Sequence, residues 1–376
     1  MPTLLVTNDF PPKIGGIQTY LWELWSRQSP DDVVVLTTPY PGADDFDSSH
    51  GFDVRRTDET WLRPTKRLER RINAIADEIH ADLVFLDPIS PLGSIGRRLE
   101  RPYVVILHGA EVNVPARLPG WGRELRKVLE NAAGVLSAGE YALSQAERVV
   151  DRPLPALVIP PGVDVERFQP VDSTRRAELR ASLGFRPDLP LVLGASRLVP
   201  RKGFDVLIDA VTAIPDTQLL IVGDGRDRDR LESRATGAGD RIRFTGAVTD
   251  ERLTETYQAA DVFAMPCRNR WGGLEQEGFG IVYNEAAAVG LPSVAGRSGG
   301  TGEAVVHGKT GFVVDGRSKS EVVEAVETLV SDPDRAYAMG VAARARVVDE
   351  LSYPVLAARL EPLVAGGLTA LTTPAA

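Results

Sequence analysis

Short apolar segments alternate with longer amphipathic ones along almost the whole chain, and this alternation limits the possible folds more than any other feature. In the first half the apolar segments are nearly continuous runs of Leu, Ile and Val, as in strands buried on both faces of a parallel sheet. The strands predicted there are Leu4–Thr7, Val33–Thr37, Leu83–Leu86, Val104–Leu107, Val135–Ser137 and Leu157–Ile159. With helical patterns between them, they predict a doubly wound α/β domain.

The second half repeats this scheme, and a length of 376 residues suits two domains. Its predicted strands are Leu191–Ala195, Leu219–Val222, Ile242–Phe244, Val262–Met265, Pro292–Ala295 and Phe312–Val314. The Pro-Pro-Gly cluster within Ile159–Asp164 indicates a hinge. We therefore expect an N-terminal acceptor domain over residues 1–165 and a C-terminal donor domain over 166–352. Residues 353–376 would add a helix that packs back on the N-terminal domain and a disordered tail from Thr369.

Two Rossmann-like doubly wound domains of this kind are expected to face a central cleft. Ligands of open parallel sheets bind beyond the carboxyl ends of the strands. The residues that carry chemistry should therefore lie in loops that follow strands.

Charge and cysteine content exclude some classes of function and location. The formal net charge of -9 argues against a nucleic-acid partner, because general nucleic-acid binders are basic. One cysteine, Cys267, fits a reducing compartment, and a small buried residue is a better interpretation of it than a nucleophile. The chain opens on a strand pattern and contains no long apolar run, so we expect no signal peptide and a cytoplasmic location.

The segment from Glu277 to Glu285 is the most specific chemical signal. If a helix begins near Gly280, its free N–H groups form an anion site suited to a diphosphate, and Gly278 lets the ligand approach the backbone. Glu277 would then point at a sugar, and Glu285 would reach ribose hydroxyls. Taken alone, the same spacing also fits an ordinary helix with an acidic start.

Two cations follow the predicted strand Leu191–Ala195. Arg197 and Lys202 stand where a diphosphate would lie, and fixed cations can neutralise such a leaving group without a divalent ion. Solvated charges at a helix start are the alternative, and we assign Arg201 to that class.

In the first half, Gly15 and Gly16 follow the first strand and offer unobstructed N–H donors before a helix. His108 follows the strand Val104–Leu107, where a neutral imidazole could hydrogen-bond a donor sugar. A Gly-Gly pair or a lone histidine is weak by itself, and only the placement favours a functional role.

Taken together, these motifs resemble retaining glycosyltransferases of family 4, which have the GT-B fold. The resemblance spans nearly the whole chain and rests on the order of Gly15–Gln18, His108–Glu111, Ile159–Asp164, Arg197–Gly203 and Glu277–Glu285. Within the family, the segment Ala264–Tyr283 is most similar to actinobacterial phosphatidylinositol mannosyltransferases of the B type, which use GDP-mannose.

The resemblance implies a role for each motif. Gly16 would approach the β-phosphate, His108 the sugar 6-hydroxyl, and Arg197 and Lys202 the diphosphate. Glu277 would hold the sugar 3- and 4-hydroxyls and Glu285 the ribose. The donor would also contact Gly15 and the backbone of Gly278, Phe279, Gly280 and Ile281. It further implies front-face displacement with retention, no protein nucleophile, and neither a cofactor nor a metal.

Base choice and metal binding each depend on a weaker signal. Asp250 resembles the family position that reads guanine, although a turn or helix-capping Asp explains it equally well. The Asp227-Arg228-Asp229 run matches an Asp-x-Asp metal motif, but its Arg-rich setting favours a surface helix.

Residues Pro64–His80 form a basic amphipathic helix pattern just after Trp61. The candidate membrane or acceptor residues on it and before it are Arg63, Lys66, Arg67, Arg70 and Arg71. Such a face suits an anionic membrane surface, and a sheet-covering helix with a solvated basic face is the alternative.

The function expected from all these signals is mannosyl transfer from GDP-mannose to a glycolipid acceptor, a phosphatidylinositol mannoside, by a protein that rests peripherally on the inner membrane face. The alternatives are a soluble acceptor with another nucleotide sugar, a GT-B nucleotide-sugar epimerase, or a non-catalytic sensor of nucleotide sugars.

Overall fold

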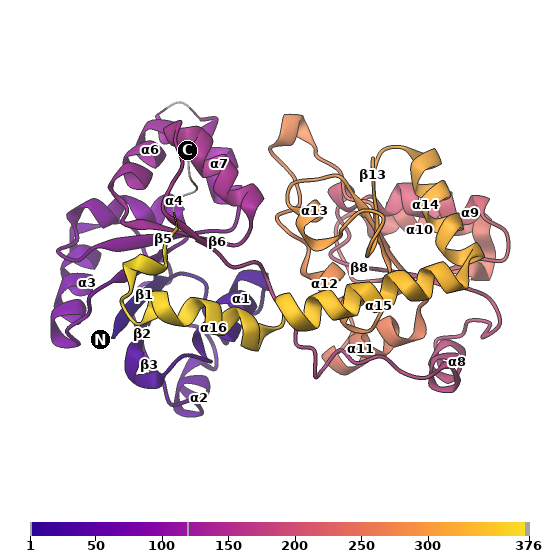
Figure 1. Ribbon diagram of the computed structural model, residues 1–376, viewed down its shortest axis with the longest axis horizontal. Helices are drawn as coiled ribbons and strands as arrows, with labels where there is room; N and C mark the ends of the chain where they lie inside the picture. Colours follow the sequence, from indigo (N-terminus) through magenta and orange to yellow (C-terminus); the bar gives the residue numbers. More distant parts are fainter. Residues whose placement is uncertain (1, 119, 373–376) are drawn as a thin grey trace. The chain divides into compact units, whose positions relative to one another are not determined.

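The computed structural model describes residues 2–118 and 120–372, and the chain divides into two compact units. The N-terminal unit comprises Met1–Pro161 and Tyr353–Ala376, and the C-terminal unit comprises Gly162–Ser352. Each unit has a parallel sheet with helices packed around it (Figure 1). The prediction of two Rossmann-like α/β domains is therefore confirmed.

The described residues of the N-terminal unit form a seven-stranded parallel sheet in the order β3-β2-β1-β4-β5-β6-β7. Its strands are β1 Thr3–Thr7, β2 Val33–Thr37, β3 Asp53–Arg56, β4 Val84–Asp87, β5 Tyr103–Leu107, β6 Gly134–Ser137 and β7 Ala156–Val158. Strand β3 was not predicted, because it lies at the sheet edge and its Asp-Val-Arg-Arg sequence contains no apolar run.

Helices of the N-terminal unit pack around this sheet. They are α1 Gly16–Trp25, α2 Ala43–Ser48, α3 Lys66–Glu78, α4 Ile89–Leu92, α5 Ala110–Ala116, α6 Trp121–Asn131, α7 Glu140–Val150 and α16 Tyr353–Val364. Helix α16 comes from the far end of the sequence and packs against α1, with Leu356, Leu360 and Leu363 fully buried. Among the described residues, no helix is long and apolar enough to cross a membrane.

The predicted disorder of the tail is partly wrong. Residues Leu368–Ala370 form a 3-10 turn, and Thr372 pairs with Ala156 through two backbone hydrogen bonds of 3.0 Å. The tail thereby extends the edge of strand β7, which supplies its unpaired N–H and C=O groups. Residues 373–376 lie outside the described part of the chain.

The described residues of the C-terminal unit form a six-stranded parallel sheet in the order β10-β9-β8-β11-β12-β13. Its strands are β8 Leu191–Ala195, β9 Gln218–Val222, β10 Ile242–Gly246, β11 Val262–Met265, β12 Ser293–Gly296 and β13 Gly311–Val314. Its helices are α8 Ser173–Ser182, α9 Phe204–Ala213, α10 Arg228–Ala235, α11 Asp250–Ala259, α12 Ile281–Ala288, α13 Thr301–Ala304, α14 Lys319–Ser331 and α15 Pro333–Glu350.

Each sheet has one point at which the strand order reverses. In the N-terminal sheet, β1 pairs with β2 on one side and with β4 on the other, and in the C-terminal sheet β8 pairs in the same way with β9 and β11. The loops diverge there, and such switch points are where doubly wound sheets bind ligands. The candidate site residues fall at both of them.

Candidate functional site

The centre of the candidate site in the C-terminal unit is the carboxylate of Glu277. This residue lies in the loop between β11 and α12 and is 8% exposed. Its Oε2 accepts a hydrogen bond of 2.7 Å from Nζ of Lys202 and a second one from Arg201. Burial raises the pKa of the carboxyl group, but the two cations outweigh that effect and hold the pKa below its ordinary value. Glu277 is therefore a buried, ionised hydrogen-bond acceptor.

Arg201 corrects one sequence prediction. It was assigned to the solvated charges, yet its side chain is only 16% exposed and lies between Glu277 and Glu275. Lys202, which follows it in the 3-10 turn after β8, is buried as well. Arg197, from the same loop, is exposed and makes no ion pair among the described residues. The loop thus carries two cations paired with Glu277 and one cation without an ion partner among the described residues.

The cysteine beside this cluster, Cys267, is buried. Sγ of Cys267 lies 3.7 Å from Oε2 of Glu277, and burial together with that carboxylate raises the pKa of the thiol to about 12. A thiol protonated at neutral pH is a poor nucleophile. The structural interpretation of Cys267 therefore holds.

Helix α12 begins at Ile281, next to Glu277. Gly280 caps it with a φ of +93°, a backbone conformation that favours glycine. A Cβ there would also lie 2.6 Å from the ring of Tyr283, whose hydroxyl donates to the Met265 carbonyl at 2.6 Å. That bond ties the helix start to the end of β11. The helix N-terminus predicted near Gly280 is thus present.

Sequence reasoning missed the loop after β12 that fixes Glu277. Ser298 Oγ accepts a hydrogen bond of 3.0 Å from the Glu277 amide and donates to Asn269 Oδ1 at 2.7 Å. Gly299 has a φ of +52°, and a Cβ on it would lie 1.8 Å from the Glu277 carbonyl oxygen. A Ser-Gly-Gly sequence, separated from the end of β12 by one residue, was the available signal.

Farther along α12, Glu285 belongs to a second polar group. Its Oε2 accepts a 2.6 Å hydrogen bond from the Tyr257 hydroxyl, and burial raises the pKa of its carboxyl group. The negative charge of Asp250 also contributes to the raised pKa of Glu285. The Asp250 side chain is 88% exposed, and its carboxylate lies 3.4 Å from the Arg167 guanidinium. The capping residue of α11 is Thr249, so Asp250 is not the helix cap.

The Asp-x-Asp run also has local partners. Both carboxylate oxygens of Asp227 accept hydrogen bonds of 2.7 Å from Arg230. Among the described residues, no group of three His, Cys, Asp or Glu side chains could hold a metal ion.

In the N-terminal unit, His108 is held by a residue that the sequence did not reveal. Its Nε2 lies 2.6 Å from Oδ1 of Asp87, and Oδ2 of Asp87 accepts from the Thr7 hydroxyl at 2.6 Å. Thr7 and Asp87 are register partners at the ends of β1 and β4, so the pair stands at the switch point. Tyr20 packs edge-on against the imidazole.

The surroundings of His108 oppose the neutral imidazole that the sequence predicted. Burial disfavours the charged ring, but Asp87, reinforced by Glu111, outweighs burial and raises the pKa of His108 above its ordinary value. The pair therefore favours an imidazolium whose Nε2 donates to Asp87. Only Nδ1 is then left to donate to a ligand.

The glycine loop after β1 is an open helix start. Gly15 caps α1 and Gly16 begins it, with an exposed backbone at Gly16. Gln18 and Lys13 both donate to Oδ1 of Asp9, at 2.6 and 2.7 Å, and this fixes the loop from within. Ile14, at its tip, is 94% exposed.

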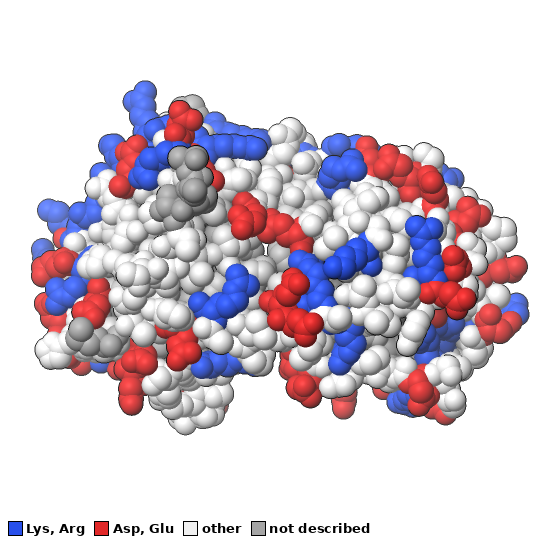
Figure 2. Space-filling view, in the orientation of Figure 1, with Lys and Arg blue, Asp and Glu red and all other residues white. Residues whose placement is uncertain are grey.

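The basic residues around α3 fall into two groups. Arg67 pairs with Asp58 at 3.1 Å, and Arg71 donates to the Arg56 carbonyl oxygen at 3.0 Å. Three others are exposed and make no ion pair among the described residues, namely Arg63, Lys66 and Arg70. On the face drawn in Figure 2, blue and red side chains mix over each unit without one large field of a single sign.

Each unit of the chain matches a family model of glycosyltransferases. The model of the family Glycosyltransferase Family 4 matches residues 14–167, and that of Glycosyl transferases group 1 matches residues 175–346. The GDP-mannose-dependent alpha-(1-6)-phosphatidylinositol monomannoside mannosyltransferase of Mycolicibacterium smegmatis is 39% identical over 96% of this chain and 98% of its own length.

The chain belongs to the GT-B glycosyltransferases of family 4. A second relative of this glycosyltransferase, the GDP-mannose-dependent monoacylated alpha-(1-6)-phosphatidylinositol monomannoside mannosyltransferase of Corynebacterium glutamicum, is 38% identical over 95% of this chain and 96% of its own length. The crystal structure of Anabaena HepE in complex with UDP matches the fold with a TM-score of 0.81 at 22% identity, covering 97% of this chain and all of that one.

Proposed function

We propose that this glycosyltransferase moves mannose from GDP-mannose to a phosphatidylinositol mannoside acceptor, with retention of configuration and without a metal. The full-length relatives from Mycolicibacterium and Corynebacterium support the choice of donor and acceptor, because their similarity to this chain extends over both units. The observation that carries the proposal is the buried Glu277 between two cations, next to the open start of α12.

In this proposal the C-terminal unit binds the donor. Lys202 and Arg201 hold the diphosphate together with Arg197, and the amides at Gly278–Ile281 add donors at the positive end of α12. Glu277 accepts hydrogen bonds from sugar hydroxyls, and Glu285 accepts from the ribose. Fixed cations of this kind stabilise the charge that develops on a leaving diphosphate, so the chemistry asks for no divalent ion.

The transfer step balances without a protein nucleophile. The bond from the sugar C1 to the donor phosphate oxygen breaks, and the acceptor hydroxyl oxygen bonds to C1 on the same face. The acceptor proton passes to the departing phosphate. The roles of Gly15, Gly16 and His108 in sugar and phosphate recognition, and of Asp250 in reading guanine, remain predictions.

Release of GDP tests this function directly. Incubated with GDP-mannose and a phosphatidylinositol monomannoside, the protein should release GDP and form a dimannoside, while UDP-glucose should yield no product. EDTA should leave the rate unchanged. Conversion of the sugar without an acceptor would indicate an epimerase, and an intact donor would indicate a sensor. Loss of activity in EDTA that added Mg²⁺ restores would contradict the metal-free step.

We also propose that the exposed cations of α3 bind an anionic membrane surface. Lys66 and Arg70 have no ion partners among the described residues, so they can approach acidic headgroups. The Lys66→Glu/Arg70→Glu variant should lower co-sedimentation with phosphatidylglycerol vesicles at least about fivefold, because each basic residue contributes about 1 kcal/mol. The matched control Lys309→Glu/Lys319→Glu has the same charge change in the C-terminal unit. Equal loss in both variants would refute a local surface.

A further inference from the structure

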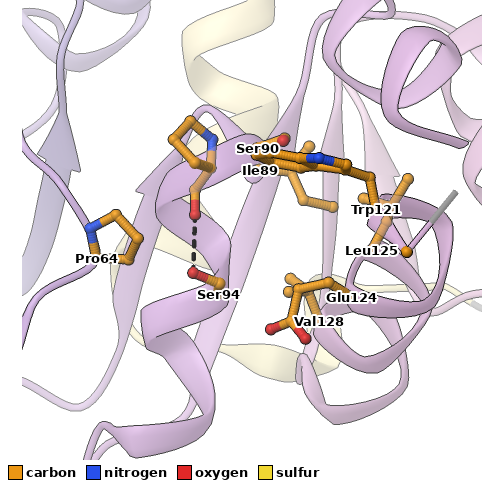
Figure 3. A pocket seen from close by; sticks show the side chains of 10 residues that line it. Pro64, Ile89, Ser90, Ser94, Trp121, Glu124, Leu125 and Val128 are labelled. Atoms are coloured by element: carbon orange, nitrogen blue, oxygen red, sulfur yellow. Dashed lines mark hydrogen bonds between the residues drawn. The ribbon is translucent and has the colours of Figure 1, made fainter. Parts of the chain in front are cut away.

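An apolar pocket of about 430 Å³ opens in the N-terminal unit. It lies between the residues just before α3, the helix α4 with the 3-10 turn Gly93–Arg98, and α6. Carbon atoms form most of its wall, from Pro64, Ile89, Pro91, Trp121, Leu125 and Val128. Figure 3 shows the indole of Trp121 reaching across the pocket toward Ile89 and Ser90. The volume lies within the usual range for a small-molecule site.

Two polar side chains on the wall already have partners inside the protein. The Ser94 hydroxyl donates to the Pro91 carbonyl oxygen at 3.0 Å, drawn as the dashed line in Figure 3. The Glu124 carboxylate accepts from Arg97 at 2.7 Å. Because carbon atoms form most of the wall, an occupant gains mainly by removing apolar surface from water.

One exposed cation lies next to a wall residue of the pocket in the sequence. Arg63 directly precedes the wall residue Pro64. Arg63 is exposed and makes no ion pair within residues 2–118 and 120–372. Trp121 is 51% exposed, which is the placement of an indole where apolar and wet regions meet.

The pocket and the histidine site share one segment of the sequence. Asp87, which holds His108 at 2.6 Å, is separated by one proline from Ile89, and Ile89 lines the pocket. Helix α5, which follows His108, packs against both α4 and α6. A molecule that placed a hydroxyl near His108 could therefore extend an apolar part into the pocket without leaving the N-terminal unit.

We propose that this pocket holds one acyl chain of the lipid acceptor. The inference rests on the proposed lipid-directed transfer and adds a subsite to it. The pocket selects an acylated acceptor over its deacylated head group, because only the former fills the apolar wall.

Two variants test the subsite kinetically. Trp121→Ala removes one wall at a half-exposed position, and Ser94→Phe fills the cavity from the opposite side. Each should raise KM for detergent-dispersed phosphatidylinositol monomannoside at least fivefold and leave kcat/KM for the deacylated glycerophospho head group unchanged. Tyr337→Ala, an exposed aromatic residue of α15 in the other unit, serves as the matched control. Unchanged KM values for both acceptors in Trp121→Ala would overturn the proposal.

Fluorescence quenching measures binding of the acyl chain independently of mannosyl transfer. A phosphatidylinositol with a brominated acyl chain should quench tryptophan fluorescence, and Trp121→Phe should abolish most of that quenching. Undiminished quenching in Trp121→Phe would place the acceptor chain elsewhere. The same conclusion would follow if quenching depended on Trp121 but Trp121→Ala left the KM for the acceptor unchanged. Dimers abolished by Trp121→Ala would assign the pocket to a second copy and overturn the inference. If neither acceptor is mannosylated by the wild type, the proposed function itself fails.

Discussion

Replacing Lys202 with methionine is expected to lower turnover of GDP-mannose at least about tenfold, or about 1.4 kcal/mol in the barrier, while the fold stays intact. Lys202 Nζ lies 2.7 Å from Glu277 in a buried position, where a cation acts strongly on a diphosphate. Because Arg201 still faces Glu277, the buried carboxylate keeps a partner. The melting temperature should therefore fall by less than about 4 °C. Turnover and thermal denaturation measure the two effects separately.

Three comparisons sharpen that test. Lys309→Met, at an exposed lysine of the same unit, should behave as the wild type. Removing both cations, in Arg201→Met/Lys202→Met, leaves a buried charge unpaired and should cost about 3–5 kcal/mol of stability. Glu277→Gln should also lose turnover at least about tenfold, yet bind GDP at least as tightly, because it frees both cations for the diphosphate. Normal turnover in Lys202→Met would refute the assigned role.

Replacing Asp87 with asparagine is expected to change both turnover and the pH dependence of stability. The buried carboxylate holds His108 at 2.6 Å and raises its pKa above the ordinary 6.5. A raised pKa stabilises the fold fully below pH 6.5, and this contribution is lost as pH rises through the folded-state pKa. In Asp87→Asn that loss should vanish, and turnover should fall at least about tenfold.

Melting temperatures across this pH window, for wild type and Asp87→Asn, provide the measurement. The control is Asp53→Asn, a change at an exposed carboxylate of the same sheet, which should keep the wild-type pH profile near pH 6.5. If Asp87→Asn showed the wild-type decline in that window, His108 would not be the group that titrates.

The sheets could be predicted because buried parallel strands leave a continuous apolar signal. Strands β2, β8 and β11 begin and end at the predicted residues, and the exposed edge strand β3 was missed since it has no such signal. The pairing of Thr372 with Ala156 was missed for a related reason, because an edge can accept any backbone.

The candidate site was predictable where it depends on local sequence and not where it depends on contacts between distant segments. The start of α12 follows from two glycines and an apolar run. The pairing of Arg201 with Glu277 joins loops far apart in the sequence, and no spacing reveals it. The raised pKa of His108 likewise follows from Asp87, which is twenty-one positions away and looks like an ordinary strand end.

The return of helix α16 to the first unit has a consequence for biosynthesis. A nascent chain that has been translated only as far as Ser352 contains every residue of the C-terminal unit. It still lacks α16, which packs over Leu24 of α1 and whose Ala357 carbonyl oxygen accepts a hydrogen bond from Gln28. The half of the protein that the ribosome makes first is thus the half that it completes last. Premature stop codons that remove α16 should therefore destabilise the N-terminal unit.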